Sequence, residues 1–283
     1  MIAALGVSAF IVFVGGRSFV ATRATLAPPR VPVRALAPLP GVREVGLTDD
    51  AGVSLRGWYS PSSNGAAVIL GHGHGANREQ LNIEFSVLAD AGFGVAAFDW
   101  PGHGESGGQC SWGDGERSAL TAVVDFVSTQ GDVEPHRIGI LGFSMGGTLA
   151  IDVAAHDARL AAVLVTGTYS TLEEEIRIDM GRWGPLSQWP ALWALRLAGV
   201  DLNAVRPIAQ VCRIAPRPVL IIDGTEDPSA PMDMEAALFA AACIPKEFWA
   251  IEGATHGDYM RWVPKEYPWR VLDFFRRSLG APL

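Results

Sequence analysis

From residue 66 onward, short apolar runs alternate with segments whose apolar residues recur at helical spacing. Most of the runs are continuously apolar, which is typical of parallel strands that are buried on both faces. The pattern therefore predicts an α/β fold with a mostly parallel, doubly wound sheet that helices cover on both sides. The expected strands are 66–70, 94–100, 137–143, 160–166, 218–222 and 248–251, and the expected helices are 78–91, 116–129, 145–155, 232–242 and 267–279. Ahead of them, a turn-like Asp49-Asp50-Ala51-Gly52 joins residues 42–48 to 53–60, which predicts an antiparallel hairpin.

The length and composition allow one large core, because the chain has 283 residues and 49% of them are hydrophobic. We expect an α/β domain at 42–283, preceded by a hydrophobic segment at 1–22 and a Pro-rich linker at 23–41. Residues 169–206 interrupt the alternation, and we expect them to form a small helical cap over the carboxyl ends of the strands. Three tryptophans of this cap are candidates for an apolar substrate site, or for packing that seats the cap on the domain: Trp183, Trp189 and Trp193.

The N-terminal segment is uncharged and mostly apolar over residues 2–16, and arginines follow it at positions 17, 23, 30 and 34. A spanning helix needs about 20 apolar residues, a length that the run reaches only if it extends through residue 21. It lacks the positive n-region and the small-residue cleavage site of a signal peptide. We therefore expect residues 2–21 to associate with a membrane as an uncleaved anchor. The side of the membrane stays open, and a secreted or a cytoplasmic protein is the alternative.

Charge and cysteine content narrow the possible partners. The formal net charge is −8 and the basic residues are scattered, so the chain lacks the clustered positive charge that nucleic-acid binding requires. Its three cysteines, Cys110, Cys212 and Cys243, are too few and too scattered for a disulfide framework or a zinc site. We expect them to be small buried apolar residues. The composition thus implies no metal and no cofactor, and it leaves the oligomeric state open.

A candidate nucleophile comes from the pattern G-x-S-x-G, which occurs at residues 104–108 and at residues 142–146. Only the second occurrence lies directly between an expected strand and an expected helix, as this motif requires. The turn strains the serine backbone, and its glycines remove side chains that would clash. The hydroxyl of Ser144 then stands at a helix N-terminus, where backbone N–H groups face developing negative charge. We predict that Ser144 is the nucleophile and that Ser106 belongs to an ordinary Gly-rich loop.

A serine nucleophile needs a base, and the base needs a partner that fixes its tautomer. With this type of turn, the acid and then the histidine follow the serine in the chain. Two histidines follow Ser144. His156 lies about three turns along the next helix, whereas His256 lies in a loop just after the strand at 248–251. We therefore predict that His256 is the base.

The acid should lie in a loop at the carboxyl end of a strand, between the serine and the histidine. Three acidic residues follow the strand at 218–222, namely Asp223, Glu226 and Asp227. Asp227 precedes a proline that fixes the loop, and it stands far enough past the strand to reach a histidine. We predict that Asp227 is the acid, with Asp223 and Glu226 as alternatives. Asp99 also ends a strand, but it precedes the serine and breaks the chain order.

The tetrahedral intermediate of acyl transfer needs two N–H donors. We expect one from Met145, the residue after the nucleophile, and the other from the glycine-rich loop at 71–75. Two histidines in this loop, His72 and His74, would suit a metal, but no carboxylate or cysteine lies nearby in the sequence. We therefore expect a backbone role for His74 and no metal.

Five motifs in register resemble those of the α/β-hydrolase superfamily. They lie at 71–78 (GHGHGANR), 99–108 (DWPGHGESGG), 142–147 (GFSMGG), 223–227 (DGTED) and 253–257 (GATHG). The chain is most similar to capped, membrane-associated serine hydrolases akin to serine aminopeptidases, monoglyceride lipases and acylaminoacyl-peptidase-like proteins. The resemblance implies an α/β-hydrolase fold with a small helical cap, and it assigns the second oxyanion N–H to His74. The chain departs from the family at Trp100, where many members have an arginine, which puts the usual salt bridge of that loop in doubt.

The resemblance also implies attack by Ser144 on an acyl carbonyl, followed by hydrolysis of the acyl-enzyme by water that His256 activates. The tryptophans of the cap favour a carboxylesterase or lipase acting on a small-molecule acyl substrate. An aminopeptidase or acylaminoacyl-peptidase-like amide hydrolase is the alternative. Glu173, Glu174 and Glu175 would then hold the substrate amine, unless they form a solvated helix face. An acyltransferase would use the same triad, whereas a non-catalytic scaffold would be expected to have lost one of its residues.

Overall fold

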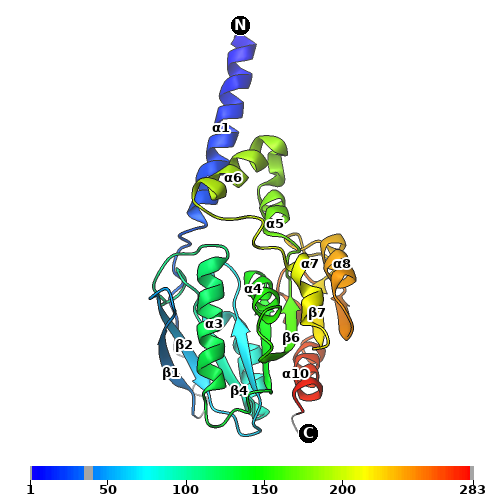
Figure 1. The fold of residues 1–283 in the computed structure, drawn as a ribbon. Coiled ribbons are helices and arrows are strands. Elements are labelled where there is room, and N and C mark those ends of the chain that lie inside the picture. The colour runs from blue at the N-terminus through cyan, green and yellow to red at the C-terminus, as the bar shows by residue number, and fades with distance from the viewer. Residues whose placement is uncertain (1, 35–40, 281–283) are drawn as a thin grey trace.

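The computed structural model describes residues 2–34 and 41–280 of the chain. Its strands are β1 (Arg43–Thr48), β2 (Ser54–Ser60), β3 (Ala67–Gly71), β4 (Gly94–Phe98), β5 (Ile138–Phe143), β6 (Leu160–Thr166), β7 (Val219–Gly224) and β8 (Lys246–Ile251). They form one sheet in the order β1-β2-β4-β3-β5-β6-β7-β8 (Figure 1). β1 pairs with β2 and β2 with β4 in antiparallel fashion, whereas every pair from β4 to β8 is parallel. The mostly parallel sheet and the N-terminal hairpin are confirmed.

Helices cover both faces of this sheet (Figure 1). The helices are α1 (Ile2–Ala24), α2 (Asn82–Asp90), α3 (Asp114–Ser128), α4 (Met145–Ala154), α5 (Leu172–Asp179), α6 (Pro185–Leu197), α7 (Pro207–Gln210), α8 (Met232–Ala241), α9 (Tyr259–Trp262) and α10 (Glu266–Leu279), with 3-10 turns η1 (Arg78–Leu81), η2 (Gly181–Trp183) and η3 (Val211–Ile214). The helix expected at 78–91 begins as η1, because the side chain of Asn77 caps it there by accepting from the amide of Glu79 at 2.9 Å.

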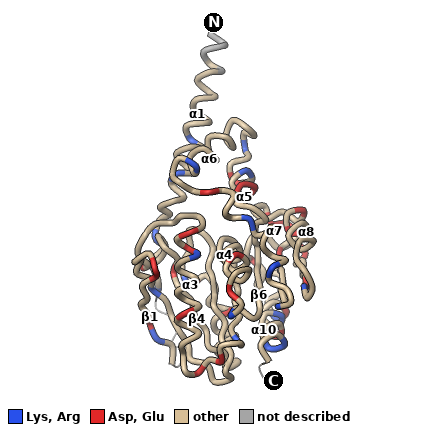
Figure 2. The backbone as a smooth tube through the Cα atoms, in the orientation of Figure 1, with Lys and Arg blue, Asp and Glu red and all other residues tan. Residues whose placement is uncertain are grey.

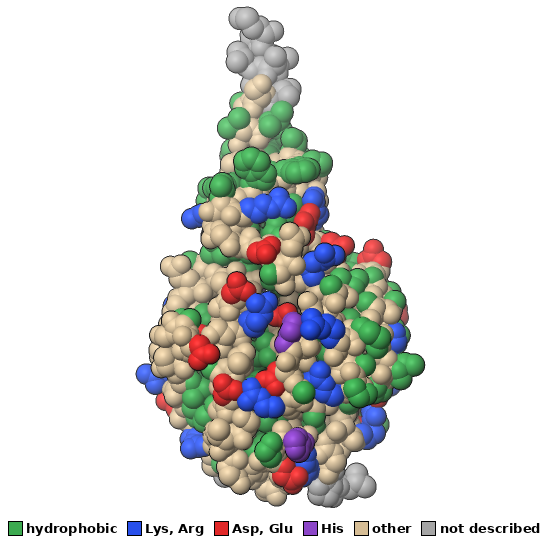
Figure 3. All heavy atoms as spheres, viewed as in Figure 1, with side chains coloured by type: hydrophobic (Ala, Val, Ile, Leu, Met, Phe, Trp, Pro, Cys, Tyr) green, Lys and Arg blue, Asp and Glu red, His purple; other side chains and the backbone are tan. Residues whose placement is uncertain are grey.

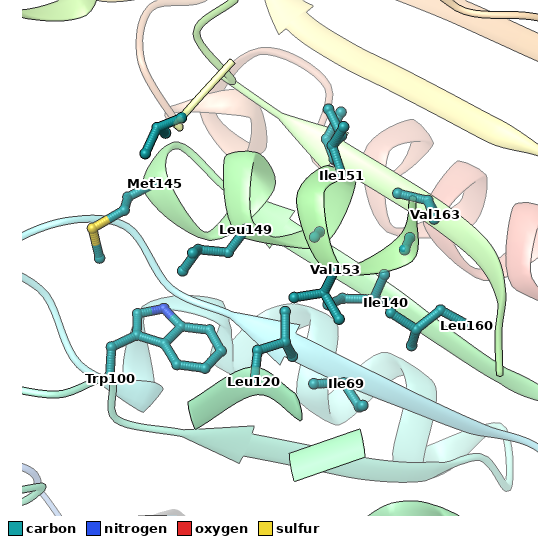
Figure 4. Packing of buried hydrophobic residues seen from close by; sticks show 14 of the residues in the cluster. Ile69, Trp100, Leu120, Ile140, Met145, Leu149, Ile151, Val153, Leu160 and Val163 are labelled. Carbon is teal, nitrogen blue, oxygen red and sulfur yellow. The ribbon is translucent and has the colours of Figure 1, made fainter. Parts of the chain in front are cut away.

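The core lies on both faces of the sheet because consecutive strand residues point in opposite directions. In β3, Ile69 belongs to the buried cluster that α3 and α4 cover, whereas its neighbour Leu70 belongs to the cluster under α2 and α10. Ile69 lies with Leu120 and Val153 in the first cluster (Figure 4). A strand buried on both faces is apolar at every position, which is the pattern in the sequence.

The segment between β6 and β7 carries α5, η2, α6, α7 and η3. α5 and α6 stand at the end of the sheet toward which its parallel strands run, with α1 beside α6 (Figure 1). This is the end at which ligand sites form in open α/β sheets. We call α5, η2 and α6 the cap. Around the sheet below, acidic and basic residues are interspersed rather than separated by sign (Figure 2).

The prediction of an N-terminal membrane anchor is wrong. Within residues 2–34 and 41–280, none of the helices has both the length and the apolar character needed to cross a bilayer. The transmembrane assignment and the membrane-anchored localisation inferred from it are therefore wrong. α1 runs through residues 2–24 and includes two arginines, Arg17 and Arg23, in its second half. Residues 35–40 of the predicted linker and residue 1 lie outside the described residues.

The second half of α1 packs on α6 of the cap. Val14 and Thr22 are buried, and the hydroxyl of Ser18 donates to the carbonyl oxygen of Ser187 at 2.5 Å. A Cβ atom on Gly15 would lie 3.3 Å from the ring of Pro190, so the two helices approach closely there. Hydrophobic side chains gather on the neck that α1 and α6 form (Figure 3). The Pro-rich stretch after α1 therefore does not separate this helix from the rest of the chain.

The expectation that all three cysteines are simple buried apolar residues also needs correction. Cys212 of η3 and Cys243, just after α8, form a disulfide with their Cα atoms 4.6 Å apart. The two lie 31 residues apart in the sequence, and only the packing of η3 beside α8 brings them together. Cys110 is a buried free cysteine.

Candidate active site

Ser144 occupies the sharp turn between β5 and α4. Its backbone has φ 53° and ψ −119°, a conformation that costs a non-glycine residue about 1–3 kcal/mol. Its amide donates to the carbonyl of Thr166 in β6 at 2.9 Å, and its carbonyl accepts from Gly147 and Thr148 at 2.9 and 3.1 Å. These bonds hold the strained residue at the N-terminus of α4, on the carboxyl edge of the sheet.

Glycines beside Ser144 let α4 approach the sheet. A Cβ atom on Gly146 would lie 2.1 Å from the carbonyl oxygen of Gly71 in β3. A Cβ atom on Gly142 would lie 2.2 Å from the carbonyl oxygen of Gly146. Both contacts are with backbone, which cannot swing aside as a side chain can. Any larger residue at either position would therefore push α4 away and move the hydroxyl of Ser144.

Asp227 and His256 form a hydrogen-bonded pair in the loops after β7 and β8, with 2.6 Å between Oδ2 and Nδ1. The other carboxylate oxygen of Asp227 accepts from the amides of Ser229 and Ala230 at 2.8 and 3.0 Å. Burial raises the pKa of Asp227, but the bonds from His256 and these amides outweigh burial and leave the pKa below its usual value. The ionised carboxylate keeps the proton of His256 on Nδ1, so Nε2 is the nitrogen that can accept one.

Phe143 connects the serine turn to the histidine loop. It directly precedes Ser144, and its ring centroid lies 4.7 Å from that of His256. A Cβ atom on Gly167, just after β6, would lie 3.0 Å from Cε1 of the same imidazole. Ser144 and His256 therefore lie on the same edge of the sheet. Within the described residues, Oγ of Ser144 and Nε2 of His256 form no hydrogen bond, a contact that in hydrolases often tightens only when substrate binds.

Two backbone amides beside Ser144 are available to a ligand. Neither the amide of Met145 nor that of His74 has a hydrogen-bond partner in the part of the chain that the structure describes. His74 follows Gly73, where a Cβ atom would lie 3.2 Å from Cβ of Ser144. The loop after β3 thus runs alongside the serine turn, and the two amides are the groups that the sequence suggested for an oxyanion.

A cavity of about 180 Å³ opens beside His256. Most of its lining is apolar or aromatic. It comes from α2 and the 3-10 turn before it, from the turn that carries Ser144, and from α9 and α10. The lining includes Leu81, Ile83, Phe143, Tyr259, Met260 and Tyr267. Such a cavity suits an apolar group of a substrate bound at Ser144.

The three cap tryptophans lie elsewhere. Trp183, Trp189 and Trp193 are 47%, 54% and 60% exposed, and none of them lines the cavity beside His256. Trp183 packs edge-on against Phe10 of α1, with 5.2 Å between ring centroids, and lines a separate cavity of about 340 Å³ between α1 and the cap. The structure does not bring them to the serine, and their role in substrate binding stays a prediction.

Two glutamates at the start of the cap, Glu173 and Glu175, differ in their exposure to solvent. Glu173 pairs with Arg177 at 2.7 Å on the partly exposed side of α5. Glu175 is buried at 7% exposure, and its Oε2 has no hydrogen-bond partner among the described residues. Burial and the negative charges of Asp179 and Asp227 raise the pKa of Glu175 to about 8.

Asp179 was not singled out in the sequence, although its spacing from Glu175 puts both on one face of α5. Asp179 is exposed at the end of α5. Its pKa is raised by the loss of part of its hydration, and the neighbouring His74 and His256 act against that rise. Asp179 therefore lies within electrostatic reach of the candidate base. The sequence signal that could have identified Asp179 is its position four residues after Glu175 on a helix of the cap.

Asp223, an alternative acid, has a different environment from Asp227. It is fully buried and accepts from the hydroxyl of Tyr259 at 3.2 Å. Burial and the negative charges of Glu235 and Asp227 raise the pKa of Asp223 to about 10. Asp223 is therefore protonated at neutral pH, and the carboxylate that binds His256 is that of Asp227.

Ser106, in the other G-x-S-x-G match, is held by the backbone. Its buried hydroxyl donates to the carbonyl of Asp99 at 2.6 Å and accepts from the amide of Arg56 at 2.9 Å. Asp99, at the start of the same loop, forms a buried ion pair with Arg78 of η1 at 2.5 Å. Arg78 thus provides a salt bridge in the loop where Trp100 replaces the arginine of many relatives.

Comparison with known proteins places this site in a family. A family model described as serine aminopeptidase, S33, matches residues 62–210, just over half of the chain. The chain belongs to this family of α/β hydrolases. Among its relatives, an uncharacterized protein of Mycobacterium tuberculosis is 32% identical over 246 residues, covering 85% of this chain and 80% of that protein. The 2,6-dihydropseudooxynicotine hydrolase of Paenarthrobacter nicotinovorans is 29% identical over 170 residues, covering 59% of this chain and 45% of that enzyme.

The fold of this family member matches solved structures. An esterase of Pyrococcus furiosus superposes with a TM-score of 0.75 at 24% identity, covering 90% of this chain and 98% of that one. This similarity confirms the α/β-hydrolase fold. The family match supports a hydrolase, and it does not identify the bond that is cleaved.

Proposed function

We propose that this hydrolase is a serine carboxylesterase that cleaves a small acyl ester through an acyl-enzyme on Ser144. The observation that carries the proposal is the Asp227–His256 hydrogen bond of 2.6 Å, which joins a buried carboxylate to a partly exposed imidazole, beside a serine held at positive φ. An ionised acid, an imidazole with a free Nε2 and a strained serine at a helix N-terminus are the parts that acyl transfer to serine requires.

In the proposed reaction, Nε2 of His256 takes the proton of Ser144 as Oγ attacks the acyl carbon. The carbonyl oxygen becomes an oxyanion, which accepts from the amides of Met145 and His74. The imidazolium is stabilised by Asp227 and returns its proton to the leaving alcohol, which departs as the acyl-enzyme forms. Water then attacks the acyl-enzyme with His256 again as base, and release of the acid regenerates Ser144.

The chemistry of the neighbouring cavity favours an ester with an apolar group of modest size. Its volume of about 180 Å³ fits a short acyl chain or one aromatic ring better than a long lipid chain. This support is independent of the cap tryptophans, none of which lines this cavity.

Covalent labelling of Ser144 tests the proposal. We expect a fluorophosphonate probe to label the wild-type chain at this serine, because the probe reacts with a serine that a neighbouring base activates. Ser144→Ala should abolish the labelling, which gel fluorescence and peptide mass spectrometry would measure. Ser106→Ala is the matched control and should retain it, since the hydroxyl of Ser106 is bonded to backbone. Labelling that survives Ser144→Ala in folded protein would contradict the assignment.

An amide hydrolase acting on a substrate with a free amine is a second candidate, and the acidic face of α5 favours it. Glu175 is buried without a partner for Oε2, and Asp179 lies near His256. A substrate ammonium held between these carboxyls would satisfy Glu175 and favour its ionised form. An N-acylated substrate has no such charge and would leave the carboxyls unpaired.

For this candidate we expect Glu175→Gln to lower kcat/KM for an aminoacyl p-nitroanilide about 10- to 100-fold, the loss of one charged hydrogen bond. The effect on an N-acetylated counterpart should be small. The pKa of Glu175 is about 8, and that of a free α-amino group is also about 8. The preference for the free amine should therefore be greatest near this pH and fall above it, because the carboxylate needs a substrate that is still protonated. Glu173→Gln, on the other side of α5, is the control. Equal losses of kcat/KM for both substrates would contradict a role of Glu175 in binding the amine, and only the esterase proposal would remain.

A further inference from the structure

Three potential metal ligands meet beside the loop after β3, which carries His74. One ligand atom each from His74, His103 and Cys110 lies within 4.8 Å of the other two. His74 follows β3, whereas His103 and Cys110 lie in the long loop between β4 and α3. No carboxylate or cysteine lies near His74 in the sequence, which is why no metal was expected there. The fold brings a cysteine there across 36 residues.

The hydrogen bonds of the two histidines leave one nitrogen of each for a ligand. Nδ1 of His103 lies 3.0 Å from the carbonyl oxygen of Pro101 and must donate to it. Nε2 of His103 then carries the lone pair, and it is buried without a hydrogen-bond partner among the described residues, in a side chain that is 1% exposed. Nε2 of His74 lies 2.8 Å from the carbonyl oxygen of Thr25 and must likewise donate, which leaves the lone pair on Nδ1. Metal-bound histidines generally make this second-shell bond to a carbonyl.

The third group is the single thiol of the chain, because Cys212 and Cys243 form the disulfide. Cys110 is 3% exposed, so bulk water does not compete for it. Groups of both signs contact the loop that carries it. The carboxylate of Glu116 lies under this loop and accepts from the amides of Ser111 and Gly113 at 2.8 and 2.9 Å. The guanidinium of Arg30 donates to the carbonyl oxygen of Gly104 at 3.2 Å.

From this arrangement we propose that His74, His103 and Cys110 form a zinc site. Two imidazoles and one thiolate are a donor set that Zn²⁺ prefers over Mg²⁺ or Ca²⁺, and a fourth position would remain for water. On binding, the thiol releases its proton to solvent, and one Zn–S and two Zn–N bonds form. Ligands of one tetrahedral zinc lie about 3.3–3.8 Å apart. The three groups therefore have to approach one another by at most about 1.5 Å, which side-chain rotation can supply.

The metal would have a positional effect beside the serine turn. It would tie the loop whose amide we assign to the oxyanion to the loop after β4. The imidazole of His74 already stacks on Trp112 at 4.4 Å, so its ring is held in place from one side. Because no ligand of the site belongs to the proposed triad, metal binding can be measured separately from catalysis in the full-length Ser144→Ala chain.

Cobalt(II) substitution tests the site. We expect the full chain, stripped with a chelator, to bind one equivalent of Co²⁺ and to show a thiolate-to-cobalt charge-transfer band, which excess Zn²⁺ removes by displacement. Cys110→Ser should lose this band, because the chain has no other thiol. His103→Gln should weaken Co²⁺ binding at least about tenfold. His136→Ala removes an exposed histidine elsewhere and is the matched control, with binding equal to the wild type.

Two results would overturn the proposal. One is the absence of stoichiometric Co²⁺ or Zn²⁺ binding by folded full-length chain. The other is binding that persists unchanged in Cys110→Ser and His103→Gln, which would locate the metal elsewhere. Circular dichroism of each variant establishes folding, and if Cys110→Ser fails to fold, the comparison of His103→Gln with His136→Ala decides.

Discussion

Replacing His256 with alanine is expected to lower kcat for a p-nitrophenyl ester by about 10⁶-fold. In the proposed mechanism this imidazole takes the proton of Ser144 and returns it to the leaving group, so its loss leaves the serine without a base. Serine and histidine act as one unit in such enzymes, and removing either costs about as much as removing both. Initial-rate measurements at saturating ester, with folding checked by circular dichroism, would test this.

The control for this prediction is His156→Ala. His156 also follows the nucleophile in the chain, but it lies just beyond the end of α4, and its Nδ1 lies 2.8 Å from the carbonyl oxygen of Asp152. Its replacement should leave the rate near that of the wild type. A loss below about 10²-fold in His256→Ala, the least that a general base contributes, would remove His256 from the mechanism.

Replacing Asp227 with asparagine is expected to lower kcat by about 10⁴-fold. The carboxylate accepts from Nδ1 of His256 and thereby keeps Nε2 free for the serine proton. An amide can instead donate to Nδ1, which would stabilise the opposite tautomer and leave Nε2 protonated. The substitution also removes the ionised group that would stabilise the imidazolium. The pKa of Asp227 lies below its usual value, so this charge is present at neutral pH in the unsubstituted chain.

Asp223→Asn separates this effect from a general loss of negative charge. Asp223 is four residues away and protonated at neutral pH, with a pKa of about 10, so an amide there replaces one neutral group with another. We expect its effect on kcat to be smaller than about tenfold. Glu226→Gln should have little effect, because Glu226 is exposed. If Asp223→Asn lowered kcat more than Asp227→Asn, the acid of the triad would be Asp223 at the end of β7.

Local patterns in the sequence were sufficient to predict the sheet. Strands buried on both faces need apolar residues at every position, and β3 and β5 show this directly. The strand–serine–helix turn was equally local, because only glycine fits where α4 meets the sheet at positions 142 and 146. The order of serine, acid and histidine then limited the candidates to loops after β7 and β8.

The structure corrected the expectations that depended on contacts between distant segments. α1 was predicted to be a separate anchor, but its second half packs on α6, more than 150 residues away, as the bond from Ser18 to Ser187 illustrates. The inward position of Glu175 depends on how α5 is seated over the sheet. For the same reason the tryptophans of the cap lie away from the cavity beside His256, although the composition alone suggested a substrate site.

The sequence by itself determined which segments become strands and which serine lies at a strained turn, because periodicity and glycine placement act over a few neighbouring residues. Only the tertiary structure decided what α1 packs against, which cap carboxyl is buried and which histidines meet Cys110. Those outcomes depend on how separate elements are seated against one another, and the energy of that seating is spread over many contacts between residues that are distant in the chain.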